Sequence, residues 1–172
     1  MTACLASVRS LEEANLVAAA GVPWLDLKEP AAGALGAVPD RVLTQISTHW
    51  RGLRTLSATV GDCWERPAEI AARVRTVAAA GLDYAKVGLF AHRPPAALMD
   101  GLRAACDAPC GVIAVCFAES PPDEHDIKEL AALGVAGLML DTANKRGPGL
   151  PGLMDEAALR AFVGNVKSHG LL

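Results

Sequence analysis

One junction recurs along the sequence, in which a helix pattern ends at a glycine and a short apolar run follows. Residues 19–22, 79–82 and 132–135 read Ala-Ala-Gly-Val, Ala-Ala-Gly-Leu and Ala-Leu-Gly-Val. Glycine is favoured where a helix ends in the left-handed conformation, and strands that alternate with helices form a parallel sheet. The repeat therefore restricts the chain to an α/β architecture, either an open sheet or a closed barrel.

Six strand–helix units can be traced in one domain over residues 1–172. Short apolar runs predict the strands, and longer amphipathic segments predict the helices. Ser10, followed by Glu13 three residues later, predicts a capping box at the first helix. The predicted strands are 3–8, 24–28, 54–60, 84–89, 112–117 and 137–141, and the predicted helices are 11–20, 40–50, 67–80, 95–106, 123–133 and 155–169.

Side-chain alternation within the strands favours the barrel. In 54–60 the hydroxyl residues alternate with aliphatic ones, and in 84–89 Lys86 opposes Ala85 and Val87. One face is thus aliphatic and suits a covering helix, while the other is polar, as inside a (β/α) barrel. An open doubly wound sheet needs two aliphatic faces, and no GxGxxG or P-loop follows any strand. We predict a TIM (β/α)8-type barrel.

The number of units is too small for a complete barrel. Such barrels have eight strands and about 250 residues, whereas this chain has 172 residues and Leu171-Leu172 only begin a seventh strand. We therefore predict a C-terminally incomplete barrel. Either the chain is truncated, or the sheet itself is incomplete and its open edges need a cover. In the second case another copy of the chain, in a homo-oligomer, would supply that cover.

Composition excludes several classes of partner. The net charge is −3 with no basic block, which argues against nucleic acid and anionic membranes as partners. No signal peptide and no apolar stretch of about 18 residues is present, so we predict a cytoplasmic protein. The five cysteines form no CxxC pair and the four histidines do not cluster, so we predict mostly buried free thiols, surface histidines, and no metal or other cofactor.

Three lysines and two aspartates fall at the ends of even-numbered strands. Lys28 ends the second strand, Lys86 lies in the fourth, and Lys145 follows the sixth. In a barrel these lysines would surround one cavity, where close ammonium groups repel and burial disfavours charge. A neutral amine can attack a carbonyl and form a Schiff base. Asp26 and Asp141 would keep the other lysines charged or transfer protons.

Four further side chains are predicted to bind substrate. Arg9 could bind a phosphate or a carboxylate, although an ion pair with an acid is an equal alternative. Ser57 and Thr59 would line the mouth of the barrel as substrate contacts or polar packing, and Asp26 shares the inward face. The glycines in 33–36 are a weak signal for an anion-binding loop.

Six short motifs, taken in order, resemble those of a known protein family. They are Ser-Val-Arg-Ser (7–10), Asp-Leu-Lys-Glu-Pro (26–30), Ser-Ala-Thr-Val-Gly-Asp (57–62), Asp-Tyr-Ala-Lys-Val-Gly-Leu (83–89), Leu-Asp-Thr-Ala-Asn-Lys (140–145) and Ser-His-Gly-Leu-Leu (168–172). As a set, the sequence resembles the (5-formylfuran-3-yl)methyl phosphate synthase family of methanofuran biosynthesis. Family members continue past His-Gly-Leu-Leu through the last strands, where barrels commonly bind phosphate.

The resemblance implies an activity and a role for each lysine. It implies a class I aldolase-like lyase that condenses two glyceraldehyde 3-phosphate molecules, with loss of phosphate and water, so that the small-molecule partner is a phosphorylated aldehyde. It also implies that Lys28 forms the Schiff base, that Lys86 accepts protons, and that Asp141 and Lys145 act as an acid–lysine pair. Two alternatives stay open. One is another lysine-dependent sugar-phosphate aldolase, and the other is a non-catalytic shortened barrel that serves as a binding or assembly subunit.

Overall fold

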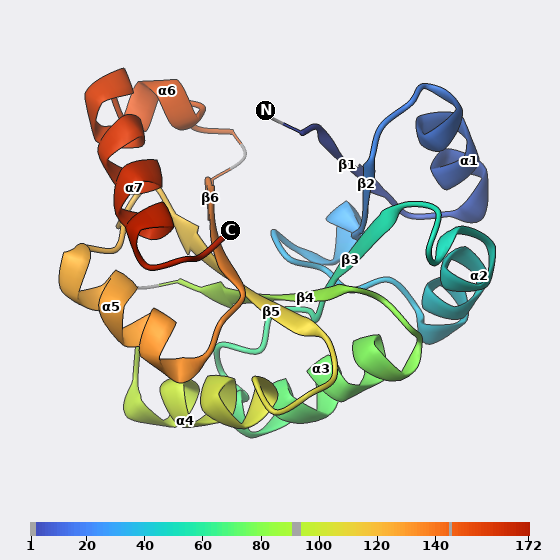
Figure 1. The fold of residues 1–172 in the computed structure, drawn as a ribbon, viewed down its shortest axis with the longest axis horizontal. Coiled ribbons are helices and arrows are strands. Elements are labelled where there is room, and N and C mark those ends of the chain that lie inside the picture. The colour runs from blue at the N-terminus through green and yellow to red at the C-terminus, as the bar shows by residue number, and fades with distance from the viewer. Residues whose placement is uncertain (1–2, 91–93, 145) are drawn as a thin grey trace.

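The computed structural model describes residues 3–90, 94–144 and 146–172, which fold around one parallel six-stranded sheet (Figure 1). The strands follow one another in sequence order, and each neighbouring pair is parallel. The sheet curls into a half-barrel with helices along its convex side. Its strands are β1 (Leu5–Val8), β2 (Trp24–Leu27), β3 (Thr55–Thr59), β4 (Tyr84–Leu89), β5 (Gly111–Phe117) and β6 (Gly137–Asp141).

The predicted strand–helix alternation is confirmed. Each predicted strand is present within two residues of its expected ends, although the predicted helix over 67–80 begins as a 3-10 turn. Two short elements were not predicted, the turn η1 and the helix α6. The helical elements are α1 (Leu11–Ala19), η1 (Pro30–Ala32), α2 (Asp40–Trp50), η2 (Pro67–Glu69), α3 (Ile70–Ala79), α4 (Ala96–Ala105), α5 (Glu124–Leu133), α6 (Leu150–Leu153) and α7 (Glu156–Ser168).

The incomplete barrel has two open edges, β1 and β6. On the outer edge of β6, the backbone N–H of Leu172 donates to Ala136 O at 3.1 Å, and Leu138 N donates to Leu172 O at 3.1 Å. This is the hydrogen-bond pattern of a parallel neighbour. Leu172 therefore pairs beside the start of β6, where the sequence predicted that a seventh strand would begin.

Apolar packing occurs on both faces of the sheet. The larger cluster joins the outward residues of the strands, such as Leu25 and Leu56, to the helices. A smaller cluster on the concave face contains Leu35, Val115 and Phe117. The predicted alternation is confirmed, but part of the inner face is apolar rather than polar.

The predicted capping box of α1 is only half formed. The Ser10 side chain accepts the Glu13 N–H at 3.2 Å, but the Glu13 carboxylate accepts the backbone N–H of Arg9, at 2.8 Å, and not that of Ser10. The complete capping box lies at α5, where Asp123 and Asp126 each accept the other's backbone N–H. Within the described ranges, no helix is long and apolar enough to cross a membrane.

Candidate active site

A row of polar side chains crosses the concave face of the first three strands. Ser7 of β1 pairs in register with Asp26 of β2, and Asp26 pairs with Ser57 of β3. Paired residues of parallel strands face the same side, so the three side chains meet. Asp26 Oδ2 accepts from Ser7 Oγ at 3.0 Å, and Asp26 Oδ1 accepts from Ser57 Oγ at 2.7 Å. The carboxylate of Asp26 is fully buried and well supplied with donors.

Lys86 completes this polar network. Its Nζ lies 2.5 Å from Asp26 Oδ2, and its side chain is only 5% exposed. Lys86 is the register partner of Thr59, two residues beyond Ser57, and its long side chain reaches back to the level of Asp26. Burial of this pair excludes water and strengthens the attraction between the two charges. The sequence predicts that Asp26 keeps a lysine charged or transfers protons, without identifying which lysine, and the structure joins it to Lys86.

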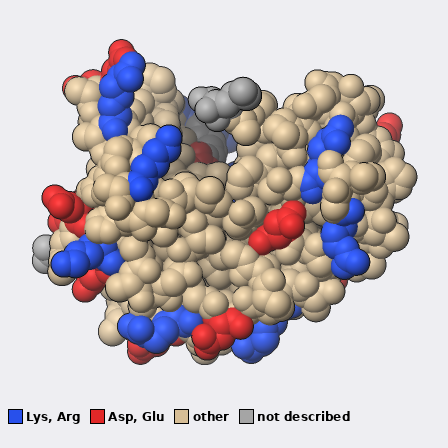
Figure 2. Space-filling view, in the orientation of Figure 1, with Lys and Arg blue, Asp and Glu red and all other residues tan. Residues whose placement is uncertain are grey.

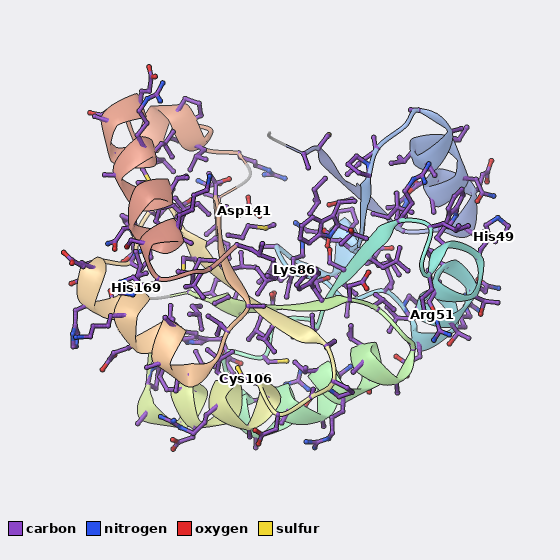
Figure 3. The ribbon with its side chains drawn as sticks, in the orientation of Figure 1. His49, Arg51, Lys86, Cys106, Asp141 and His169 are labelled. Carbon is purple, nitrogen blue, oxygen red and sulfur yellow. The ribbon has the colours of Figure 1, made fainter. Side chains whose placement is uncertain are left out.

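Lys28 has a different acid as its neighbour. Its Nζ lies 3.8 Å from Asp141 Oδ2, with the two side chains 16% and 28% exposed. Lys28 follows β2 and Asp141 ends β6, so the pair spans the curl of the sheet. Lys86 and Asp141 both lie on the concave side (Figure 3). The structure thus gives each of these two lysines its own carboxylate, and Lys28 is the more accessible amine.

Two aromatic residues close the base of the network. Trp24 Nε1 donates to Ser57 Oγ at 3.0 Å, and the Trp24 ring stacks on Tyr84 with centroids 5.1 Å apart. Sequence reasoning did not identify these two residues. The signal was present, because Trp24 stands two residues before Asp26 and Tyr84 two residues before Lys86, and alternation places each pair on one face.

The segment after Lys28 folds back over the concave face. Thr59 Oγ1 donates to Gly36 O at 2.7 Å, and Glu29 N donates to the same carbonyl at 2.9 Å. These bonds place Leu35, which is 1% exposed, directly over Gly88, where a Cβ atom would overlap its side chain. Thr59 therefore anchors this loop, which is the polar-packing alternative that the sequence left open beside a substrate contact.

Arg9 stands apart from the network. Its side chain is 57% exposed and forms an ion pair with Glu13 at 3.1 Å. This is the ion-pair alternative that the sequence left open. Two predicted residues, Lys145 and His92, lie outside the described residues.

The predicted surface position of the histidines holds for the three that are described. His49 packs against Trp50, His125 lies 3.5 Å from Glu129, and His169 is exposed. Throughout the described ranges, no three His, Cys, Asp or Glu side chains gather into a group that could hold a metal ion.

The five cysteines are free thiols. Cys63 and Cys116 are buried, as predicted, while Cys106 and Cys110 are half-buried. Cys4 is exposed, so the expectation of burial is wrong for it. Burial raises the pKa of Cys116 to about 12, which keeps this thiol protonated and unreactive.

The surface carries a pocket on the helix side and a hollow at the open side of the curl. A small pocket lies between α4 and α5, on the helix side of the sheet, and is lined by residues such as Leu89, Met99 and Leu130. None of its lining residues is a lysine. In Figure 2 the surface is hollowed between the α6–α7 side and the α1–α2 side, at the open side of the curl, and acidic and basic side chains are interspersed over this view.

Comparison with known proteins gives a consistent set of relatives. A family model described as 4-HFC-P synthase matches residues 4–172. A Methylorubrum extorquens protein named "Putative (5-formylfuran-3-yl)methyl phosphate synthase" is 40% identical over 168 residues, which cover 98% of this chain and 69% of that protein. The (5-formylfuran-3-yl)methyl phosphate synthase of Methanopyrus kandleri is 33% identical, and the match covers 97% of this chain and 75% of the relative.

Solved structures resemble this chain in fold. CutC from Streptococcus agalactiae superposes with a TM-score of 0.74 at 13% identity, over 98% of this chain and 85% of CutC. Oxaloacetate acetylhydrolase superposes with a TM-score of 0.62 at 16% identity, over 95% of this chain and 62% of that structure. At these identities the likeness concerns the arrangement of strands and helices alone.

Proposed function

Because the chain belongs to the 4-HFC-P synthase family, we propose that it is a (5-formylfuran-3-yl)methyl phosphate synthase that works through a Schiff base. Two molecules of glyceraldehyde 3-phosphate would condense into the furan aldehyde phosphate, with loss of one phosphate and two water molecules. One observation carries this proposal. The concave face holds two separate lysine–carboxylate pairs, one buried and one accessible.

Lys28 is the residue we propose as the nucleophile. The Lys28 side chain is 16% exposed, whereas that of Lys86 is 5% exposed, so Lys28 is the more accessible of the two paired lysines. When Lys28 is neutral, its nitrogen can add to the aldehyde carbon of one triose phosphate, and loss of water then gives the imine. Asp141, 3.8 Å away, can accept the proton that the amine releases and return it to the departing hydroxyl.

Lys86 and Asp26 are suited to a second proton transfer. An imine carbon acidifies the neighbouring C–H bond, and removal of that proton gives the enamine that attacks the second triose. In the proposed reaction the neutral form of Lys86 takes this proton, and its ammonium form then stays beside Asp26. Ser7 and Ser57 hold the Asp26 carboxylate in place with two hydroxyl donors.

The steps that lose water and phosphate are proposed to involve residues at and after the end of β6. Closing the furan ring requires loss of water and of one phosphate, and each leaving oxygen needs a proton or a positive charge. Asp141 lies where β6 ends, and Lys145 follows four residues later. We propose that these two residues assist the eliminations as an acid–lysine pair.

Borohydride trapping tests the proposal directly. The protein is incubated with glyceraldehyde 3-phosphate, reduced with sodium borohydride and mapped by peptide mass spectrometry. We expect an adduct on Lys28 that is absent from Lys28→Arg but retained in Lys128→Arg, a matched change on the exposed face of α5. An adduct confined to other lysines would refute the role of Lys28.

Product analysis separates the two alternatives. A furan aldehyde absorbs in the ultraviolet, whereas a simple aldol does not. An adduct on Lys28 without this absorbance would favour another sugar-phosphate aldolase. Absence of both the adduct and the furan product would favour a non-catalytic binding subunit.

A further inference from the structure

The backbone of the loop that follows β6 donates hydrogen bonds to two carboxylates. The first N–H group of this loop, that of Thr142, donates to Asp141 Oδ1 at 2.7 Å. The next two, those of Ala143 and Asn144, donate to Glu119 Oε2 and Oε1, both at 3.0 Å. Hydrogen bonds to an ionised acceptor are stronger than those to a neutral one. Glu119 thus holds two consecutive peptide groups with its two oxygens.

Glu119 is itself placed by the end of β5. Ala118 N donates to Asp141 O at 2.9 Å, which continues the ladder between β5 and β6. Ser120 N donates to Phe117 O at 3.0 Å, which closes a tight turn around Glu119. The side chain therefore projects from a defined turn, beside the strand end that carries Asp141.

The orientation of Asp141 depends on this loop. Its Oδ1 accepts the Thr142 N–H, and its Oδ2 is the atom nearest Lys28. The side chain is 28% exposed, and the hydrogen bond from Thr142 is one of the contacts that hold it. A shift of the loop backbone would turn Oδ2 away from the amine.

We propose that Glu119 is a positioning residue, which holds the loop 142–144 so that Asp141 presents Oδ2 to Lys28. This inference rests on the proposed function, because it assigns Glu119 to the same reaction. Glu119 acts through Asp141 and is given no role in bond making. No pattern in the sequence marked Glu119, since it follows β5 and not one of the even-numbered strands that carry the lysines.

Glu119→Gln is the first variant to measure. The amide keeps one acceptor oxygen but points an NH2 group at the other backbone N–H, so one of the two bonds is lost. We expect kcat to fall about tenfold, because small misplacements of catalytic groups cost one to two orders of magnitude, and KM to change less than twofold. Glu129→Gln on α5, an exposed acid of the same kind, should retain full activity.

A double-mutant cycle with Asp141→Asn separates positioning from a general loss of stability. The measured quantity is the single-turnover rate of borohydride-trapped adduct on Lys28, which remains measurable when turnover is slow. If Glu119 acts through Asp141, the double variant forms the adduct at the rate of Asp141→Asn alone. Rates that multiply independently would overturn the proposal.

Two further outcomes are informative. If Glu119→Gln does not unfold cooperatively in urea, the cycle is repeated with Glu119→Asp, which keeps the charge but is too short to reach both N–H groups. A second result is that the unaltered protein forms the adduct while the Glu119 variants are as active as Glu129→Gln. That result refutes this inference and leaves the proposed function intact. Absence of the adduct in the unaltered protein refutes the proposed function itself.

Discussion

Lys86 on β4 and Asp26 on β2 form a buried ion pair across the intervening strand β3, with 2.5 Å between Nζ and Oδ2. Ser57, on the strand between them, donates to the other oxygen of the same carboxylate. Three adjacent strands thus contribute to one charged cluster that is almost fully buried. The cluster fixes the proton-transfer residues of the proposed site and also affects the stability of the fold.

Removal of the Lys86 ammonium group should lower the free energy of unfolding. Lys86→Met would leave Asp26 buried with hydroxyl donors but no positive charge, so we expect the free energy of unfolding to fall by about 3–5 kcal/mol. Urea unfolding measures this change, and Lys128→Met on α5 serves as the control. If Lys86→Met unfolds at the same urea concentration as the control, the pair does not contribute as the geometry indicates. Adding Asp26→Asn should recover part of the loss.

Ser57→Ala should destabilise the protein by about 1–3 kcal/mol, the cost of leaving buried polar groups unsatisfied. The substitution removes a donor from Asp26 and the acceptor of Trp24 Nε1. Thermal or urea unfolding can be compared with Ser168→Ala, an exposed serine on α7. Equal stability of the two variants would contradict the network.

The apolar part of the concave face should also be sensitive. Leu35→Ala would leave a cavity over Gly88 and beside Phe117, and we expect a loss of about 2–5 kcal/mol in unfolding free energy. Leu53→Ala, at a side chain that is 64% exposed, should change stability by less than about 0.5 kcal/mol. Similar losses for the two variants would show that Leu35 is not packed inside the curl.

Thiol labelling should distinguish the cysteines. Burial raises the pKa of Cys116 to about 12 and also raises that of Cys63, so both thiols stay protonated at pH 8. Cys4 is exposed and should react first with a thiol-specific reagent, in a phase that disappears in Cys4→Ser. Cys116 should react only when urea unfolds the protein. Fast labelling of Cys116 in the folded protein would contradict its burial.

The start of α1 should show a pH-dependent contribution. The backbone N–H of Arg9 holds the pKa of Glu13 below its ordinary value of 4.5. A lowered folded-state pKa means that the stabilisation is present above the unfolded value and is lost as pH falls through the folded value. The stability difference between the unaltered protein and Glu13→Gln should be about 0.5 kcal/mol at pH 7 and should shrink below pH 4.5. Glu12→Gln is the matched control, and a difference that grows in acid would contradict the assignment.

The fold was largely predictable because its signals are local. Apolar runs bounded by Gly21, Gly81 and Gly134 predicted the alternation of strands and helices, and these three glycines all adopt positive φ. Alternation within each strand then predicted the inner face. That reasoning placed Asp26 and Lys86 correctly on one side of the sheet.

The pairing of charges could not be predicted in the same way. Which acid meets Lys28 depends on the stagger of the strands and on the curl of the sheet, which bring Asp141 of β6 across to the end of β2. Alternation within a strand reports the face of a side chain but not its height relative to distant strands. The fold of the loop around Leu35 likewise arises from contacts between segments far apart in sequence. So do the hydrogen bonds from Ala143 and Asn144 to Glu119.

The span of the Lys28–Asp141 pair has a consequence for the order of folding. Lys86 and Asp26 need only β2, β3 and β4 to assemble, whereas Lys28 meets Asp141 only after β5 and β6 have joined the sheet. Closing a longer chain segment costs more entropy, and distant contacts form more slowly than near ones. A partly folded chain that contains β1–β4 can therefore hold the buried pair, whereas it cannot hold the accessible one. Lys28 thus gains its acid partner only when the sheet is nearly complete.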